Sequence, residues 1–182
     1  ITLLGRIGDL YQQKLGNPGR AMSTYLDALE LDGADRRILQ RLLDLQTKSG
    51  QWTRAVETIS KFLEHETEPA YRGAYFLAAA AIKRTELRDN AGALDDFEHA
   101  LDELLRESPL RPATRRRALQ TFHDVDALLT EDKDWKTQEQ AYRRMIKRMP
   151  SGDPALVPLW HALGELCLSR LDHVQSAIQA FE

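Results

Sequence analysis

The chain has 182 residues, of which 42% are hydrophobic and 29% are charged, so it is long enough for one globular domain or at most two small ones. Its formal net charge of -3 argues against a general nucleic-acid or membrane-surface binder, and no apolar run reaches the roughly 20 residues that a bilayer-spanning helix needs. The single cysteine, Cys167, excludes an internal disulfide and any metal site built from several cysteines.

Apolar residues recur at helical spacing along the whole chain, and no short stretch alternates apolar and polar side chains as a half-buried strand would. Proline is tolerated in the first turn of a helix but not in its interior, so Pro18 and Pro69 mark helix starts. Three glycines follow apolar stretches and are expected to end helices with a positive φ: Gly16, Gly33 and Gly50. The sequence predicts ten helices, at residues 2–15, 19–31, 35–49, 53–66, 70–88, 91–107, 113–130, 135–148, 154–170 and 173–182.

The two ends of the chain are similar to each other. Residues 7–11 (IGDLY) match residues 163–167 (LGELC), and without a gap Ala21 then meets Ala177 and Tyr25 meets Phe181. The offset of 156 residues corresponds to four units of 39 residues on average. A helix pair cannot bury its apolar face alone, so repeated pairs are expected to stack on one another.

This pattern resembles the tetratricopeptide repeat (TPR) family, whose unit is a helix–turn–helix of about 34 residues with Leu-Gly and an aromatic residue on the first helix, and small, aromatic and small residues on the second. The resemblance implies an all-α solenoid of antiparallel helix pairs, wound as a right-handed superhelix. It also implies one domain over residues 1–182, with repeats at about 1–34, 35–68, 69–110, 111–152 and 153–182, the last of them truncated.

Two repeats depart from the pattern. Repeat 2 has Leu43 at the glycine position and Gln46 at the aromatic position, whereas repeat 4 has Asp126 at the glycine position and Gln138 at the second small position. The spacing from Ala55 to the equivalent Ala93 is 38 residues, so longer helices or turns are expected there. A different α-solenoid remains the alternative.

In TPR proteins the first helices line a concave groove, and the resemblance assigns twelve residues of this chain to it. Several are basic, which suits an acidic partner segment, and Phe76 is expected to receive an apolar side chain. The family's carboxylate clamp is absent, because aspartates occupy its asparagine positions. The expected groove residues are Arg6, Asp9, Gln13, Arg37, Gln40, Arg41, Asp44, Lys48, Phe76, Lys83, Arg84 and His123, with Ala80 and Ala127 beside them.

No catalytic or metal-binding constellation is recognised in the sequence, so neither enzymatic activity nor a cofactor or metal is expected. The pairs Asp95–Asp96 and Asp124/Asp126 are interpreted as solvated helix faces, and Cys167 as a buried apolar residue. The run Arg115–Arg117 is interpreted as an exposed triplet, with grip on phosphate or an acidic peptide as its alternative. Six aromatic residues are expected to lie mostly in the core: Trp52, Phe62, Phe97, Trp135, Tyr142 and Trp160.

The leading functional hypothesis is a protein-interaction scaffold that binds a protein or peptide. One alternative is a structural spacer or a self-association segment that forms a homo-oligomer through its truncated C-terminal repeat. An RNA-binding solenoid of half-repeats is a further alternative, although nucleic acid and membrane are not expected as partners. Because the chain begins at Ile1 without methionine and ends at Glu182 within a helical pattern, we expect a piece of a longer protein, with the cytoplasm as the default location.

Overall fold

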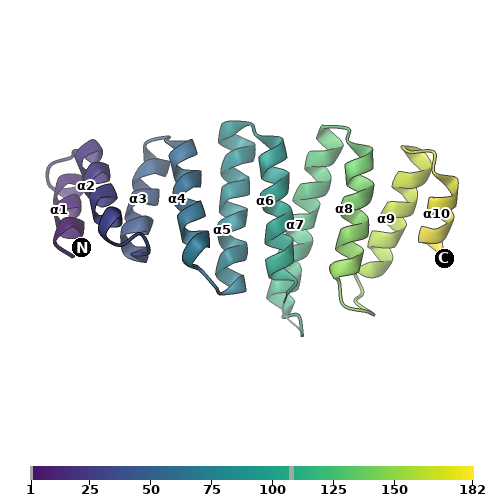
Figure 1. The fold of residues 1–182 in the computed structure, drawn as a ribbon. Coiled ribbons are helices and arrows are strands. Elements are labelled where there is room, and N and C mark those ends of the chain that lie inside the picture. Colours follow the sequence, from purple (N-terminus) through teal and green to yellow (C-terminus); the bar gives the residue numbers. More distant parts are fainter. Residues whose placement is uncertain (1, 107–108) are drawn as a thin grey trace. The chain divides into compact units, whose positions relative to one another are not determined.

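The computed structural model describes residues 2–106 and 109–182. Over these residues the chain forms ten α-helices, one five-residue π-helical segment and no strand, which confirms the predicted all-α architecture. Figure 1 shows the helices in chain order. They are α1 (Thr2–Gln13), α2 (Pro18–Leu31), α3 (Arg36–Lys48), α4 (Trp52–His65), α5 (Pro69–Ile82), the π-helical segment η1 (Lys83–Leu87), α6 (Asn90–Leu104), α7 (Pro112–Glu131), α8 (Trp135–Arg148), α9 (Leu156–Ser169) and α10 (Val174–Phe181).

The chain divides into two compact units, Ile1–Asp96 and Phe97–Glu182, and the division falls within α6. In unit 1, α1 packs on α2, α2 on α3, α3 on α4 and α4 on α5. In unit 2, α7 packs on α8, α8 on α9 and α9 on α10. The predicted repeats 1–34 and 35–68 correspond to the pairs α1–α2 and α3–α4, and 153–182 corresponds to α9–α10.

Helix starts follow local capping chemistry. The Asn17 side chain accepts a hydrogen bond from the Arg20 backbone N–H at 3.0 Å, directly ahead of Pro18 in the first turn of α2. Asp35 likewise accepts from the Arg37 N–H at 3.0 Å and starts α3. A capping oxygen satisfies one of the backbone donors that the first helical turn leaves free, which is why these polar residues define the boundaries.

Each turn between the two helices of a pair contains one residue with positive φ. Gly16 and Gly50 take this position in repeats 1 and 2, as expected. In the later repeats the position is held by residues that do have a side chain, and the sequence did not reveal them: Arg88, Lys133 and Asp172, each with φ 56°. The prediction for Gly33 is wrong, because that glycine does not have a positive φ; α2 ends at Leu31, and its C-cap residue Asp32 is extended.

The first helix of repeat 3 is not a single α-helix. The sequence predicts one helix over residues 70–88, but the α-helical hydrogen bonds end at Ile82 and a π-helical turn follows from Lys83 to Leu87. A π-helical turn accommodates additional residues in a helix without breaking it. This turn accounts for at least part of the longer spacing between Ala55 and Ala93.

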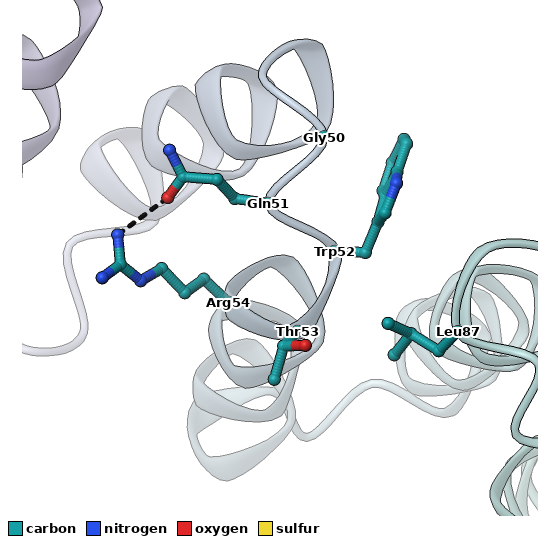
Figure 2. Close-up of a pocket in the computed structure, with 6 residues that line it drawn as sticks. All are labelled: Gly50, Gln51, Trp52, Thr53, Arg54 and Leu87. Atoms are coloured by element: carbon teal, nitrogen blue, oxygen red, sulfur yellow. Dashed lines mark hydrogen bonds between the residues drawn. The ribbon is translucent and has the colours of Figure 1, made fainter.

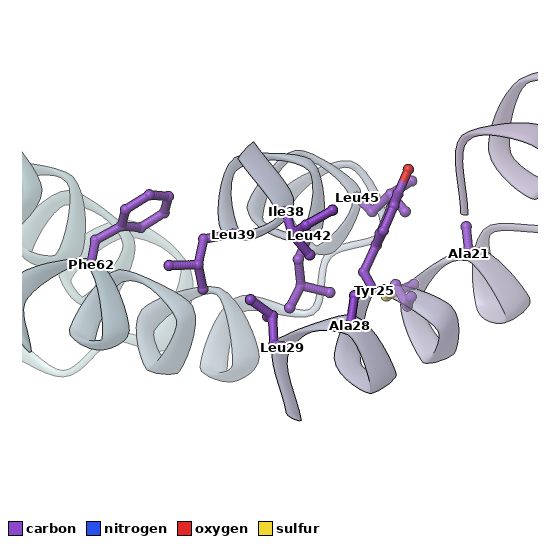
Figure 3. Packing of buried hydrophobic residues seen from close by; sticks show 10 residues of the cluster. Ala21, Tyr25, Ala28, Leu29, Ile38, Leu39, Leu42, Leu45 and Phe62 are labelled. Carbon is purple, nitrogen blue, oxygen red and sulfur yellow. The ribbon is translucent and has the colours of Figure 1, made fainter. Parts of the chain in front are cut away.

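The core of unit 1 is centred between α2 and α3 (Figure 3). Tyr25 is fully buried, and a Cβ atom added at Gly8 would overlap its ring, so glycine is needed for α1 to approach α2. The glycine–aromatic pairing expected from the repeat pattern is therefore present in repeat 1. The buried cluster consists of Ala21, Met22, Tyr25, Ala28 and Leu29 from α2, Ile38, Leu39, Leu42 and Leu45 from α3, and Phe62 from α4.

The two degenerate repeats replace the missing pattern residues with buried polar contacts. In repeat 2, Gln46 is buried and accepts a hydrogen bond from the Thr58 hydroxyl at 2.8 Å. In repeat 4, the Gln138 side-chain amide donates to the Asp126 carboxylate at 2.7 Å, so the two departures of that repeat bond to each other. Asp126 is thus part of a contact between α7 and α8, which corrects its interpretation as a solvated side chain.

Unit 2 combines an apolar core with ion pairs between repeats. Cys167 is fully buried, as predicted, and this burial raises the pKa of its thiol. Glu98 on α6 contacts Arg144 at 2.8 Å and Arg148 at 2.6 Å, both on α8. Of the six aromatic residues expected in the core, Phe62, Phe97 and Tyr142 are buried, Trp52 and Trp135 are half-buried, and Trp160 is exposed.

Candidate functional site

The first helices of repeats 1 and 2 approach each other closely. A Cβ atom at Gly5 of α1 would lie 2.9 Å from the Ile38 side chain of α3, so a larger residue here would require that side chain to shift. Beside it, Asp9 and Arg41 form an ion pair of 3.0 Å between the two helices. We call the side of these helices that carries the predicted residues the α1–α3 face; it consists of Arg6, Asp9 and Gln13 on α1 and Arg37, Gln40, Arg41, Asp44 and Lys48 on α3.

Asp9 links three helices. Its carboxylate accepts a hydrogen bond from the Tyr25 hydroxyl of α2 at 2.7 Å in addition to its ion pair with Arg41 of α3. Burial of the ring and the adjacent Asp9 carboxylate both raise the pKa of Tyr25. Asp9 and Arg41 therefore hold the helices together as well as contributing charge to the face.

The remaining charged side chains of the α1–α3 face are directed to solvent. The Arg37 side chain is 77% exposed, with its guanidinium 3.7 Å from Asp35, and Arg6 and Lys48 are also exposed. Gln40 donates a hydrogen bond to Asp44 at 3.0 Å along α3. The face thus carries four cations against two carboxylates, although the chain as a whole has a net charge of -3.

The predicted groove residues of repeat 3 are in more enclosed positions. Phe76 is half-buried, with the Arg72 guanidinium 5.7 Å from its ring centroid, and Ala80 is buried. The Lys83 ammonium lies 2.7 Å from the Asp96 carboxylate, and its side chain is only 20% exposed. Asp96 is therefore paired within the repeat, which corrects its interpretation as a solvated side chain.

Arg84 on η1 is half-buried. The last predicted residue, His123, is exposed on α7 in unit 2, and Ala127 is half-buried on the same helix.

Arg36 is a surface arginine that the sequence analysis did not single out. Its guanidinium donates a hydrogen bond to the Tyr75 hydroxyl at 3.0 Å, forms an ion pair with Glu66 at 3.1 Å and lies 4.7 Å from the Tyr71 ring centroid. The two tyrosines are four residues apart on α5, and this spacing is the signal that could have pointed to a cation between the repeats.

The arginine run at the start of α7 is more than an exposed triplet. Arg115 donates two hydrogen bonds to Asp153, at 2.8 and 2.7 Å, and the Asp153 side chain is only 9% exposed. These bonds raise the pKa of Arg115 and lower the pKa of Asp153. Arg115 and Asp153 line an open cavity of about 710 Å³, and Arg116, which is exposed, lines it as well.

A second open cavity, of about 350 Å³, lies in unit 1 beside the turn between α3 and α4 (Figure 2). Trp52 and Leu87 project toward this space from α4 and η1. Gln51 and Arg54 are joined by a hydrogen bond of 2.8 Å on the side away from Trp52. The cavity is shallow and offers an apolar contact rather than a set of reactive groups.

Within residues 2–106 and 109–182, no group of three or more His, Cys, Asp and Glu side chains is arranged to hold a metal ion. In the same part of the chain, none of the helices has the length and apolar character needed to cross a membrane. The fold and surfaces together define an α-helical repeat protein built from TPR-like helix pairs.

Comparison with solved structures finds proteins of similar fold. A crystal structure of MamA protein shares 16% sequence identity and a TM-score of 0.51, over 99% of this chain and 87% of that chain. A MamA RS-1 ArsTM double mutant shares 16% identity and a TM-score of 0.50, over 99% and 89%. A tetratricopeptide repeat protein from Parabacteroides merdae ATCC 43184 shares 17% identity and a TM-score of 0.48, over 98% and 62%. No family model matches the sequence, and no curated protein matches it.

Proposed function

We propose that this chain is a protein-interaction scaffold whose α1–α3 face binds an acidic segment of a protein partner. The observation that carries the proposal is the excess of cations on this face, with Arg6, Arg37 and Lys48 directed to solvent. Arginine forks bind carboxylates through paired, charge-assisted hydrogen bonds, so this arrangement favours an acidic ligand.

The geometry favours a site restricted to unit 1. Asp9 and Arg41 pair α1 with α3, so the helices that carry the exposed cations are already side by side before a partner arrives. Lys83 is paired with Asp96, so a partner would gain little from it without breaking that pair. The proposal therefore includes the α1 and α3 residues and leaves out the predicted extension to Phe76, Lys83, Arg84 and His123.

The test is a pull-down from a lysate of the native cell, read by mass spectrometry, that compares the wild-type chain with Arg6→Glu/Arg37→Glu. Arg41 is left unchanged, because a glutamate there would repel Asp9 and destabilise the fold. The matched control is Arg54→Glu/Lys61→Glu, which makes the same change in net charge at exposed positions of α4.

Loss of a partner in the Arg6/Arg37 variant, with retention in the control, is the expected result. Retention of every partner by both variants would exclude the α1–α3 face. Capture of no partner by the wild-type chain would instead favour the spacer role.

A second candidate function, self-association, is favoured by a separate observation in unit 2. The pair α9–α10 exposes Val157, Trp160 and Phe181 around an open cavity of about 470 Å³. Apolar faces of this kind drive association when a second copy covers them. Light scattering across a range of concentrations tests this. The candidate is eliminated if the wild-type chain stays monomeric, or if Val157→Glu leaves the mass of an oligomer unchanged.

A further inference from the structure

The cavity beside Arg115 and Arg116 is the surface that the proposed function does not use. It lies in unit 2 between the N-terminal end of α7 and the segment that precedes α9, and its volume is about 710 Å³. The side chains that matter for its chemistry are Leu110, Arg115, Arg116, Leu119 and Asp153. We call this cavity the α7–α9 pocket.

One wall of the α7–α9 pocket is fixed in place. Arg115 donates from Nε and Nη2 to the two carboxylate oxygens of Asp153, at 2.8 and 2.7 Å. Asp153 also accepts a hydrogen bond from the Ala155 backbone N–H at 2.8 Å. A bidentate arginine–carboxylate pair has a defined planar geometry, so this wall of the pocket is in place before a ligand arrives.

The other charged side chain of the pocket, Arg116, is exposed to solvent. Among the described residues that line the pocket, Asp153 is the only carboxylate, and it already accepts three hydrogen bonds from Arg115 and Ala155. The first turn of α7 contains no acidic residue, and positive charge near a helix N-terminus adds to the positive end of the helix dipole. Within the part of the lining that the structure describes, no second carboxylate is therefore present to compensate the charge of Arg116.

Apolar side chains lie beside this charge. Leu110 and Leu119 are both half-buried and line the same cavity, so each presents part of its surface to it. A ligand with only a negative charge would leave this apolar surface in water. A ligand that places an apolar side chain next to a carboxylate would match both features.

We propose that the α7–α9 pocket binds an acidic segment of a partner protein in which a glutamate or aspartate adjoins a leucine-like side chain. The carboxylate pairs with Arg116, and the apolar side chain packs against Leu110 and Leu119. A nucleic acid is the less suitable ligand, because the chain carries a net charge of -3 and the described lining residues include two cations, one of them already paired. This inference does not depend on the α1–α3 face, so either proposal can fail without the other.

The direct test is fluorescence anisotropy with a labelled hexapeptide of sequence Glu-Leu-Asp-Glu-Leu-Glu and the whole 182-residue chain. Three probes serve for comparison. Two are hexapeptides, of sequence Gln-Leu-Asn-Gln-Leu-Gln and Glu-Gly-Asp-Glu-Gly-Glu, and the third is a decanucleotide of thymidine. The variants are Arg116→Glu and Arg116→Gln, with Arg117→Glu as the matched control, because Arg117 is exposed one residue away but does not line the pocket. Far-UV circular dichroism checks that each variant is folded.

The proposal expects the acidic leucine peptide to bind the wild-type chain more tightly than any comparison probe. Arg116→Glu and Arg116→Gln should weaken this binding at least about tenfold, as expected for one lost charge-assisted hydrogen bond, while Arg117→Glu stays within about threefold. Equal losses in the Arg116 and Arg117 variants would show a diffuse charge effect and overturn the proposal. Tighter binding of the decanucleotide, equal binding of the glycine peptide, or absence of peptide binding at millimolar protein would also overturn it.

Discussion

Repeats 1 and 5 have the same sequence pattern, 156 residues apart, but very different burial. Tyr25 is fully buried, whereas its counterpart Phe181 is 48% exposed, and Met22 is 9% exposed where its counterpart Ile178 is 45% exposed. In both repeats the aromatic ring lies against the glycine of the first helix, because a Cβ at Gly8 or Gly164 would overlap it. The pattern within a helix pair thus decides which residues meet, and the neighbouring helix decides how deeply they are buried.

The neighbouring helix that covers repeat 1 is α3, the first helix of repeat 2. It packs on α2 and contributes Ile38, Leu39 and Leu42 to the cluster around Tyr25. The Tyr25 hydroxyl in addition donates to Asp9, whereas the Phe181 ring has an edge contact with His161 at 5.6 Å between centroids. Tyr25 is therefore enclosed by α1 on one side and α3 on the other, and the expected effects of equivalent substitutions differ accordingly.

The largest difference is expected on truncation of the two aromatic residues. Tyr25→Ala should lower the free energy of unfolding by about 3–5 kcal/mol, because it leaves a cavity in a closed core. Phe181→Ala should cost about 1 kcal/mol, because about half of the ring is already in water. Urea unfolding followed by circular dichroism measures both, and equal losses would contradict the role assigned to α3.

Substitution of the equivalent glycines, Gly8 and Gly164, should likewise destabilise repeat 1 more than repeat 5. Gly8→Ala forces a methyl group into the buried Tyr25 ring and should cost about 1–3 kcal/mol. Gly164→Ala meets the half-exposed Phe181, which has space to move, and the higher helix propensity of alanine offsets the remaining strain by up to about 1 kcal/mol. Thermal unfolding of the two variants should show a clear loss for the first and little change for the second; equal losses would show that Phe181 is as constrained as Tyr25.

Removal of the Tyr25 hydroxyl should make the aromatic residue of repeat 1 chemically equivalent to Phe181 of repeat 5. Tyr25→Phe loses the bond to Asp9 and should cost about 1 kcal/mol at pH 7. Because the pKa of Tyr25 is raised in the folded chain above its unfolded value of about 10, the hydroxyl stabilises the fold fully below pH 10 and loses this effect as the pH rises further.

The variant should therefore lose stability less steeply than the wild type above pH 10. Tyr142 has a pKa raised in the same direction by its burial and by Asp126, so part of the alkaline dependence should remain in Tyr25→Phe. Urea unfolding at pH 7, 9, 10 and 11 measures this. Parallel pH profiles for wild type and variant would contradict the raised pKa of Tyr25.

The smallest effects are expected at the turns within the repeats. Gly50 adopts φ 66° and Lys133 adopts φ 56°, so the same backbone shape is taken once by glycine and once by a residue with a side chain. Gly50→Ala should destabilise the chain by about 1 kcal/mol and Lys133→Gly should stabilise it by up to about 1 kcal/mol. Opposite shifts in the melting temperature are expected, and shifts of the same sign would mean that local contacts of the Lys133 side chain outweigh its backbone strain.

Sequence patterns predicted the helices well because spacing, prolines and capping residues act locally. The same reasoning treated the positions of the repeat one at a time, so Asp126 and Gln138 looked like two independent defects. In the structure they form one hydrogen bond, as do Gln46 and Thr58 in repeat 2. Pairing between two helices depends on their packing, which no single-position pattern contains.

For a similar reason, some of the predicted binding residues are exposed as expected and others are paired inside a repeat. The resemblance to TPR proteins assigned Arg6 and Arg37 to one face of the first helices, and both are exposed, because periodicity determines which side of a helix a residue occupies. Lys83 was assigned to the same surface, but the π-helical turn and Asp96 give it an ion pair inside the repeat. The bidentate contact of Arg115 with Asp153 joins residues 38 positions apart, so the cavity beside it had no sequence signal beyond the arginine run.

By itself, the sequence determined the all-α class, the helix pairs and the residues that meet within a pair, since these follow from local propensity and from the repeat pattern. The tertiary structure alone decided which of two equivalent aromatic residues is buried, which arginines are paired and where an open pocket lies. The physical reason is that burial and ion pairing depend on what a neighbouring helix brings within a few ångströms, and that neighbour is distant in the sequence.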